Sequence, residues 1–227
     1  MLERLYALTE LSPRRRIANL LYAIPSPLHL CDHEDLVESF TSERGSQQGC
    51  VLGTLLFCLG LQPILEQASD GLSDLTVSAY IDDLAVVGPL DQVSIFFERL
   101  SVLSHTLGLI ISLPKSSLLW ASDLQVPKTV EEWATSCHIP LIRGAVPLLG
   151  SMVGLDPLRR QQSASDRVKS MEPFFQARLH PLFTTQATLL LLRVCALPKF
   201  NFTCRTLSPR VISTACAAFD RLILGAA

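Results

Sequence analysis

The chain has 227 residues, of which 48% are hydrophobic and 18% charged. These proportions exclude a disordered protein, and the length leaves room for one domain, or one and a fraction, with a sizeable core. The net charge of −2 conceals an asymmetry, because residues 1–139 carry 8 Lys and Arg against 17 Asp and Glu, whereas residues 140–227 carry 11 against 4. An acidic half can hold cations and a basic half can contact phosphates, although Arg-rich helix surfaces also occur without nucleic acid.

The cysteine pattern and the apolar segments indicate the cellular compartment in which the protein is expected. The seven cysteines form no Cys-x-x-Cys pair and stand at no zinc-finger spacing from a His. An odd number of cysteines without a signal peptide indicates a reducing compartment. We recognise no targeting segment and no transmembrane segment in the sequence. We therefore expect an intracellular protein, nuclear or cytoplasmic, with no membrane partner.

A helix and a hairpin are predicted at the start of the chain. Ser12-Pro13 is a good cap and first position for a helix through residues 14–23, with Ile17, Leu20 and Leu21 as its apolar face. Residues 28–31 and 36–40 then flank a polar turn and predict two paired strands. The acids of that turn, at 32–35, are better explained by solvation than by metal binding.

The segment Gln47-Gln48-Gly49 predicts a loop, and a helix follows from about Leu52 to Gln67. That helix is apolar almost all round, so it must be buried on most sides.

A second hairpin is predicted around two adjacent carboxylates, Asp82 and Asp83. Apolar residues lead up to the pair and an apolar run resumes directly after it, which predicts two short strands with the acids at the tip. Two like charges side by side repel, so the pair must be solvated, protonated or bridged by a cation. Taken alone, the pair is better explained by a solvated hairpin turn than by a metal site, because Asp is a common turn residue.

The rest of the chain is predicted to be mainly helical. A helix from Asp91 is capped by Gly108, a short buried strand covers residues 109–111, and Lys115 lies in the loop beyond. A short helix over Glu131–Ser136 and a hairpin over Pro147–Val153 follow. Beyond Pro157 the apolar spacing is helical to the end of the chain.

Four sequence blocks in a fixed order resemble those of reverse transcriptases. They are Gly45–Phe57 with its Gln-Gly pair, Ala79–Val87 with Tyr80-Ile81-Asp82-Asp83, Leu107–Ser116 ending near a Lys, and Pro147–Gly154. A lone Tyr-x-Asp-Asp is a weak signal, whereas the ordered set is specific. The resemblance covers roughly Leu5 to Gly154 and is greatest to enzymes of non-LTR retrotransposons.

The resemblance implies an α/β (α+β) fold in which a small antiparallel palm sheet is backed by helices and followed by a helical thumb-like region. Residues 1–155 would form the palm and residues 156–227 the thumb-like region. The activity implied is RNA-directed DNA polymerisation by two-metal nucleotidyl transfer.

The resemblance also assigns roles to residues. Asp82 and Asp83 would be catalytic ligands of Mg²⁺, with Mn²⁺ as an alternative, and Lys115 would protonate the departing pyrophosphate. The positions implied for nucleotide and template are Gln47, Gln48, Gly49 and Tyr80. Leu149 and Gly150 would grip the primer. The partners implied are an RNA template, a DNA primer and a dNTP.

One family motif is not found. In reverse transcriptases a first catalytic Asp lies on a strand well before the Gln-Gly block, and here no Asp precedes Asp32. We therefore expect a truncated palm, with another polymerase segment supplying the missing carboxylate. Two other interpretations stay open: an inactive retrotransposon remnant that at most binds nucleic acid, and an unrelated α/β protein with a chance Asp pair.

Overall fold

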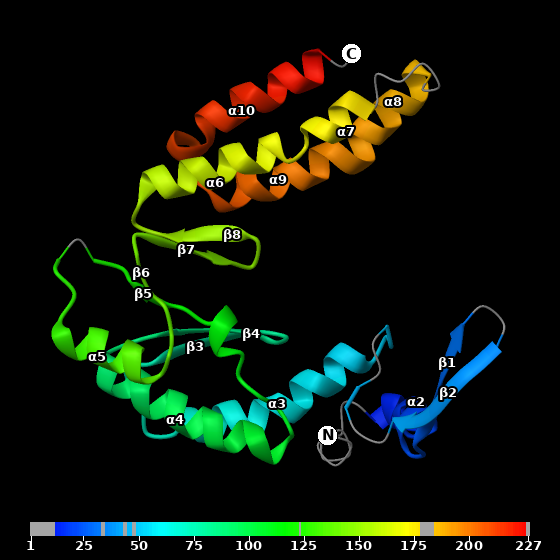
Figure 1. The fold of residues 1–227 in the computed structure, drawn as a ribbon, viewed down its shortest axis with the longest axis vertical. Helices are drawn as coiled ribbons and strands as arrows, with labels where there is room; N and C mark the ends of the chain where they lie inside the picture. Colours follow the sequence, from blue (N-terminus) through cyan, green and yellow to red (C-terminus); the bar gives the residue numbers. More distant parts are fainter. Residues whose placement is uncertain are drawn as a thin grey trace. The chain divides into compact units, whose positions relative to one another are not determined.

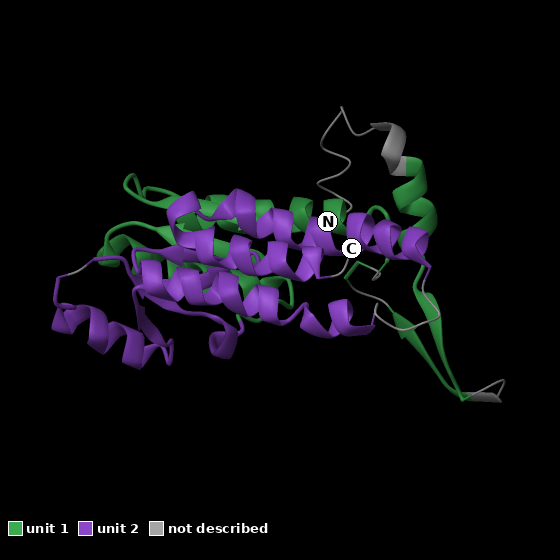
Figure 2. Ribbon diagram, turned by 90° about the horizontal axis from the view of Figure 1, so that it is seen from above, with its two compact units in different colours: residues 1–111 green, residues 112–227 purple. Residues whose placement is uncertain are grey.

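The computed structural model describes residues 12–32, 35–42, 45–46, 49–122, 124–177 and 184–225. The chain divides into two compact units, residues 1–111 and residues 112–227 (Figure 2). Each unit is described by itself. The boundary predicted at residues 155 and 156 is a different division and stays a prediction.

The described residues of the first unit form three helices and two hairpins. In chain order its elements are α2 (Ser12–Tyr22), β1 (Ser26–Asp32), β2 (Asp35–Ser42), α3 (Gly53–Ser69), β3 (Thr76–Tyr80), β4 (Asp83–Val87) and α4 (Leu90–Thr106) (Figure 1). Both strand pairs, β1 with β2 and β3 with β4, are antiparallel. The helices and hairpins predicted for this part of the chain are confirmed to within a few residues.

Helix α2 contacts α3 through a small residue. Ala18 is fully buried against Leu56 and Leu59, whereas Ile17 is 53% and Leu20 84% exposed. The apolar face predicted from the large side chains of α2 is therefore wrong. The contact from α2 is made by the Ala18 methyl group, with the partly buried Tyr22 packed beside it.

A single core connects α3, α4 and the β3–β4 hairpin. Ile64 and Ala68 of α3 are buried together with Phe96 and Leu100 of α4. Side chains from one face of the hairpin pack on this cluster, namely those of Val77, Leu84 and Val86. An isolated two-stranded hairpin is marginally stable in water, so this core fixes the hairpin in place.

The segment after α4 differs from its prediction. Residues 109–111 form no strand, and Ile110 is 81% exposed while Ile111 packs against the α3–α4 core. The side chains of Ile110 and Ile111 thus face solvent and core in turn, as along a strand, but these residues pair with no strand in the described part of the protein.

The second unit begins with short strands and ends in a helical bundle. Its elements are η2 (Leu113–Lys115), β5 (Leu118–Trp120), α5 (Lys128–Ser136), β6 (Leu141–Arg143), β7 (Ala145–Leu148), β8 (Ser151–Gly154), α6 (Pro157–Lys169), α7 (Glu172–Ala177), α8 (Thr185–Leu191), η3 (Leu192–Ala196), α9 (Leu197–Thr206) and α10 (Pro209–Leu224). Strands β5 and β6 are parallel, and β7 and β8 form an antiparallel hairpin. The mixed architecture of helices with small antiparallel sheets is the predicted α/β (α+β) class.

The bundle core is built from α6 to α10. Phe219 of α10 stacks on Phe200 of α9 with ring centroids 4.5 Å apart, and its edge meets Phe175 of α7 at 6.0 Å. Val168 and Ile212 are buried in the same cluster. Helix α6 packs along α10 and also contacts β8 and α9, so the β7–β8 hairpin is attached to the bundle.

One continuous helix, Thr185–Thr206, is long and apolar enough to cross a membrane by length and composition alone. Core helices of soluble proteins pass the same test, and this one contributes Leu192, Ala196 and Phe200 to the bundle core. It includes the π-helical turn η3, which ends two residues before Pro198. Proline cannot donate the regular helical hydrogen bond. The expectation of no membrane partner stays a prediction.

Candidate functional site

The β3–β4 hairpin has a two-residue loop. Tyr80 pairs with Asp83 across the ladder, so the loop consists of Ile81 and Asp82. The predicted tip is thus displaced by one residue, since Asp83 is the first residue of β4. Ile81 has φ 58°, as at the first central position of a type II′ turn. A β-branched residue is rare there, and the left-handed backbone costs it about 1–2 kcal/mol.

The register of the hairpin separates its two faces. Val77 pairs with Val86 and Ala79 with Leu84, and this face meets the α3–α4 core. Tyr80 and Asp83 belong to the opposite face. Tyr80 is 63% exposed, and both Asp82 and Asp83 are exposed. The hairpin therefore presents a phenol and two carboxylates at one end, supported from behind by the core.

Within the described part of the chain, the two carboxylates have no protein partner. Neither Asp82 nor Asp83 takes part in a hydrogen bond or ion pair with the residues that the structure describes. Over the same residues, no group of three or more His, Cys, Asp or Glu side chains comes together to form a metal site. Mg²⁺ is typically held by one or two carboxylates completed by substrate phosphates. The pair thus fits a cation shared with a nucleotide and does not by itself form a complete metal cage.

The segment before α3 is described in part. Gln47 and Gln48 lie outside the described residues. Gly49 has φ 83°, a conformation that favours glycine, and a Cβ built there would meet no atom within 4 Å. The open space beside Gly49 leaves room for a ligand to approach its backbone.

Cys50 follows directly and was not anticipated as a special residue. Hydrogen bonds from the Tyr22 side chain and from the backbone amides of Leu52 and Gly53 lower the pKa of the Cys50 thiol. The first turn of α3 thus stabilises negative charge one residue away from Gly49.

Lys115, Leu149 and Gly150 belong to the second unit. Lys115 ends the short 3₁₀ turn η2 and is exposed, with no ion-pair partner in the described segments. Leu149 and Gly150 are the loop between β7 and β8, with φ 49° and 79°. Positive φ at both central positions is the signature of a type I′ turn.

The β7–β8 turn is bound to the helical bundle by contacts that the sequence did not indicate. The Ser151 hydroxyl donates to Thr206 Oγ1 at 2.9 Å, and the Arg167 guanidinium donates to the carbonyl oxygen of Gly150 at 3.3 Å. Thr206 is 55 positions from Ser151, and no local pattern could have paired them.

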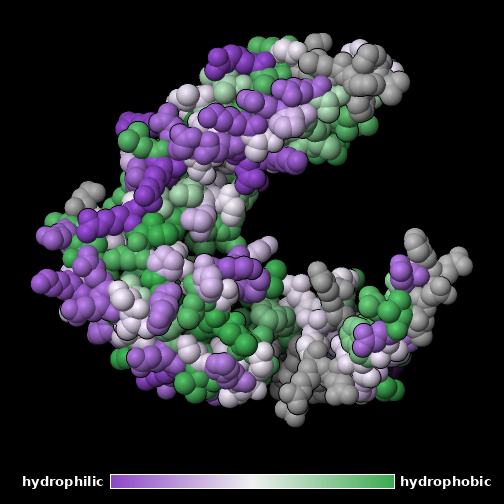
Figure 3. All heavy atoms as spheres, in the orientation of Figure 1, coloured by the Kyte–Doolittle hydropathy of each residue, from purple (hydrophilic) through white to green (hydrophobic). Residues whose placement is uncertain are grey.

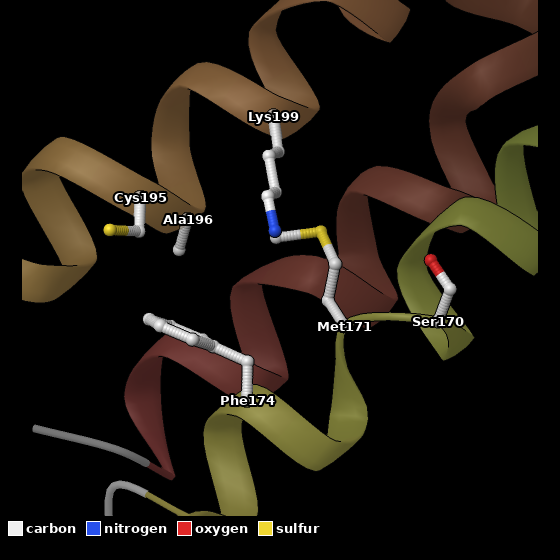
Figure 4. A pocket seen from close by; sticks show the side chains of 6 residues that line it. All are labelled: Ser170, Met171, Phe174, Cys195, Ala196 and Lys199. Atoms are coloured by element: carbon white, nitrogen blue, oxygen red, sulfur yellow. The ribbon is translucent and has the colours of Figure 1, made fainter. Parts of the chain in front are cut away.

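The bundle has a small internal pocket and an open groove. The pocket, about 30 Å³, lies between α9 and the α6–α7 corner, with Lys199 reaching towards Met171 and Phe174 (Figure 4). It has room for about one water molecule and excludes a nucleotide. The groove, about 450 Å³, runs along the exposed side of α9 and is lined by Pro198, Asn201, Phe202, Arg205 and Thr206.

Basic side chains are distributed over the helices of the bundle. Arg159, Arg167 and Lys169 are exposed on α6 while Arg160 is half-buried, and Arg178 lies outside the described residues. Three more exposed cations follow along the Thr185–Thr206 helix, namely Arg193, Lys199 and Arg205. Hydrophilic side chains gather over this part of the molecule on the face seen in Figure 3.

A family model described as reverse transcriptase (RNA-dependent DNA polymerase) matches residues 2–139, which is more than half of the chain. The chain belongs to the reverse transcriptase family. The predicted family is therefore confirmed, and the matched range includes the β3–β4 hairpin, Gly49 and Lys115 but ends before Leu149. Reverse transcriptase domains in general use divalent metal ions and act on nucleic acid and nucleotides.

A curated relative is also a mobile-element protein. The chain is 27% identical over 119 residues to the retrotransposable element SLACS 132 kDa protein of Trypanosoma brucei gambiense. The aligned part is 52% of this chain and 10% of that protein, so the chain spans only a small fraction of its relative. The likeness supports a reverse transcriptase segment of retrotransposon type.

Proposed function

We propose that the chain contributes the palm and thumb-like parts of an RNA-directed DNA polymerase. The observation that carries this proposal is the β3–β4 hairpin, which presents Tyr80, Asp82 and Asp83 exposed, with neither carboxylate bound to a side chain among the described residues. The hairpin lies within the residues matched by the reverse transcriptase model. Carboxylates left free on a strained and well-supported turn are typical of a site built to meet a ligand.

Asp82 and Asp83 would hold the divalent ions, which we propose are Mg²⁺ with Mn²⁺ as a substitute. When bound, such ions activate the primer hydroxyl and stabilise the leaving oxygen. Asp82, in the loop, is the more direct ligand, and Asp83 is fixed by its pairing with Tyr80. The open backbone at Gly49 would admit the nucleotide or template, and Lys115 would deliver a proton to the departing pyrophosphate.

The substrates we propose are an RNA template, a DNA primer and a dNTP. Gln47 and Gln48 would contact template or nucleotide, and the Leu149–Gly150 turn would grip the primer. The basic bundle would bind the sugar–phosphate backbone, with Arg167 and Arg205 beside the turn and the groove of α9. Such a reaction belongs inside the cell, in the nucleus or cytoplasm, and the seven unpaired cysteines agree with a reducing compartment.

The number of carboxylates favours a second candidate function for the chain on its own. The described residues bring no third acid to Asp82 and Asp83. Two carboxylates adjacent on one turn cannot both bind one ion and reach round to bridge another. Another polymerase segment would have to supply the missing ligand, and without it the chain would bind nucleic acid and not extend it.

Primer extension on the full chain tests the proposal, with Mg²⁺ or Mn²⁺ and a DNA primer on an RNA template. The absence of a third carboxylate should cost about 4 kcal/mol of transition-state stabilisation. Each 1.36 kcal/mol is a factor of ten in rate, so the reaction should be roughly a thousandfold slower. We expect slow extension that Asp82→Asn abolishes. The matched control is Asp70→Asn, because Asp70 is an exposed acid of the same unit whose backbone carbonyl, not its side chain, binds Arg99.

Binding of Mn²⁺ in the presence of dNTP, followed by EPR, separates the two candidates. Weaker binding in Asp82→Asn but not in Asp70→Asn supports the catalytic assignment even when extension is too slow to detect. Extension that persists in Asp82→Asn contradicts the assignment. Nucleic-acid binding without extension or dNTP-dependent Mn²⁺ binding supports the second candidate.

A further inference from the structure

The turn between β7 and β8 has a backbone that needs support. Leu149 and Gly150 both have positive φ, a conformation that Leu adopts rarely, and Leu149 is 46% exposed. The hairpin has only two strands of four residues each, Ala145–Leu148 and Ser151–Gly154. Two strands of this length are marginally stable without contacts to other elements.

Helix α9 supplies one such contact through a relay of hydroxyl groups. The Ser151 hydroxyl donates to Thr206 Oγ1 at 2.9 Å, and the Thr206 hydroxyl donates in turn to the carbonyl oxygen of Phe202 at 3.0 Å. Thr206 is therefore an acceptor towards the turn and a donor towards its own helix. Its orientation is fixed by both bonds, which makes it a defined anchor for Ser151.

Helix α6 supplies a second contact from another direction. The Arg167 guanidinium donates to the carbonyl oxygen of Gly150 at 3.3 Å. A Cβ built on Gly150 would lie 3.6 Å from the Phe202 ring and 3.9 Å from Arg167 Nη2. The turn thus lies beside the Phe202 ring and the Arg167 guanidinium, and glycine is favoured at position 150 by its positive φ, not by a lack of room.

Both anchors belong to a rigid frame. Arg167 precedes Val168, which is 3% exposed, and Thr206 precedes Leu207, which is 6% exposed. Val168 and Leu207 are members of one buried cluster. The groove along α9 is lined by Phe202 and Thr206 too, so the supported turn and the groove form one continuous surface.

We infer that Thr206 and Arg167 are positioning residues that hold the Leu149–Gly150 turn against α9, so that a primer strand lying along the α9 groove meets the turn in one fixed geometry. The inference rests on the proposed function, which supplies the strand. Arg205 and Asn201 line the groove beside the anchors and have the charge and hydrogen-bonding groups that suit a phosphodiester backbone.

Two variants at Thr206 test this inference. Thr206→Val removes the side-chain hydroxyl and keeps the side-chain shape, whereas Thr206→Ser retains the hydroxyl. Thr214→Val is the matched control, because Thr214 Oγ1 accepts from Gln161 between α10 and α6, away from the turn. Two quantities are measured on the full chain: amide hydrogen exchange at residues 149–151, and binding of fluorescent DNA–RNA duplexes with either a recessed primer end or blunt ends. Arg167→Gln is measured in the same way.

We expect Thr206→Val to speed exchange at the turn by about two- to tenfold, the effect of one net hydrogen bond. It should weaken binding of the recessed duplex by a similar factor and leave blunt-duplex binding unchanged. Thr206→Ser and Thr214→Val should behave like the parent chain, and Arg167→Gln should reproduce the faster exchange.

Unchanged exchange in Thr206→Val overturns the inference. Faster exchange together with an equal loss of binding to recessed and blunt duplexes also overturns the inference. The same holds for faster exchange with no loss of binding to either duplex, because Thr206 would then have only a structural role. If the parent chain binds neither duplex, the proposed function fails and the strand-positioning role fails with it. The exchange data still decide separately whether the anchor exists.

Discussion

Replacing Phe96 by alanine tests whether the hairpin that carries Asp82 and Asp83 depends on the core beneath it. Phe96 is 2% exposed and lies in the cluster on which the hairpin packs. Truncation of a buried Phe costs about 3–5 kcal/mol. A unit of this size has about 5–15 kcal/mol of total stability at roughly 0.05–0.15 kcal/mol per residue. Phe96→Ala should therefore remove a large share of the free energy of unfolding of residues 1–111, although Phe96 belongs to α4 and not to the hairpin.

The matched control is the neighbouring aromatic residue. Phe97 is half-buried on the same helix, so Phe97→Ala should cost distinctly less, and Phe96→Leu, which retains most of the volume, should cost below about 1.5 kcal/mol. Urea unfolding followed by circular dichroism and amide exchange over residues 76–87 gives the two measurements. Trp120 and Trp133 lie in the second unit, so their fluorescence reports there. A Phe96→Ala cost no greater than that of Phe97→Ala, with unchanged exchange in the hairpin, would refute the reasoning.

Three further predictions follow from the described residues. The Cys50 thiol should be alkylated by iodoacetamide with a pH midpoint below 9.0, and the Cys204 thiol, whose pKa burial raises, with a midpoint above it; mass spectrometry resolves the two. Equal alkylation profiles for the two thiols would contradict this prediction. Because the folded-state pKa of Cys50 is lowered, the thiolate stabilises the fold above the unfolded-state pKa, and this stabilisation is lost as pH falls through the folded-state pKa. Ile81→Asn should match or exceed the parent chain in thermal stability, because Asn tolerates positive φ; a clear loss in a melting curve contradicts the strain argument. Arg205→Gln should reduce the salt dependence of duplex binding by about one unit of log–log slope, and an unchanged slope would place Arg205 away from phosphate.

The hairpin at Asp82 and Asp83 could be predicted closely because its apolar residues alternate on both sides of the acids. The exact loop could not, since Ile81-Asp82 carries none of the Gly or Asn signals by which two-residue turns are recognised. The cross-strand pairing of Tyr80 with Asp83 decided the loop, and pairing depends on the register of two strands.

Burial was harder to predict than the elements themselves. The large residues Ile17 and Leu20 were expected to face the core, and the structure buries Ala18 instead. Side-chain size alone does not decide which face of a helix is buried, because that depends on where the partner helix α3 lies. The run at residues 109–111 was too short to have a period, so its hydrophobicity alone could not distinguish a buried strand from an extended segment with Ile110 in solvent.

The roles of Thr206 and Ser151 had no sequence signal, because both are ordinary polar residues whose importance arises from packing α9 against the β7–β8 turn. The carboxylates are the opposite case. Their metal-binding role is a prediction from residue type and order alone, and the structure adds their exposed position on the β3–β4 hairpin. Within the described residues β3 and β4 pair only with each other, so each strand keeps one edge with unpaired backbone groups. Such an edge readily accepts another strand. A segment that adds a strand there and carries a carboxylate at its end would extend the sheet and offer a third ligand beside Asp82 and Asp83. We therefore expect primer extension by this chain to increase when such a segment is supplied.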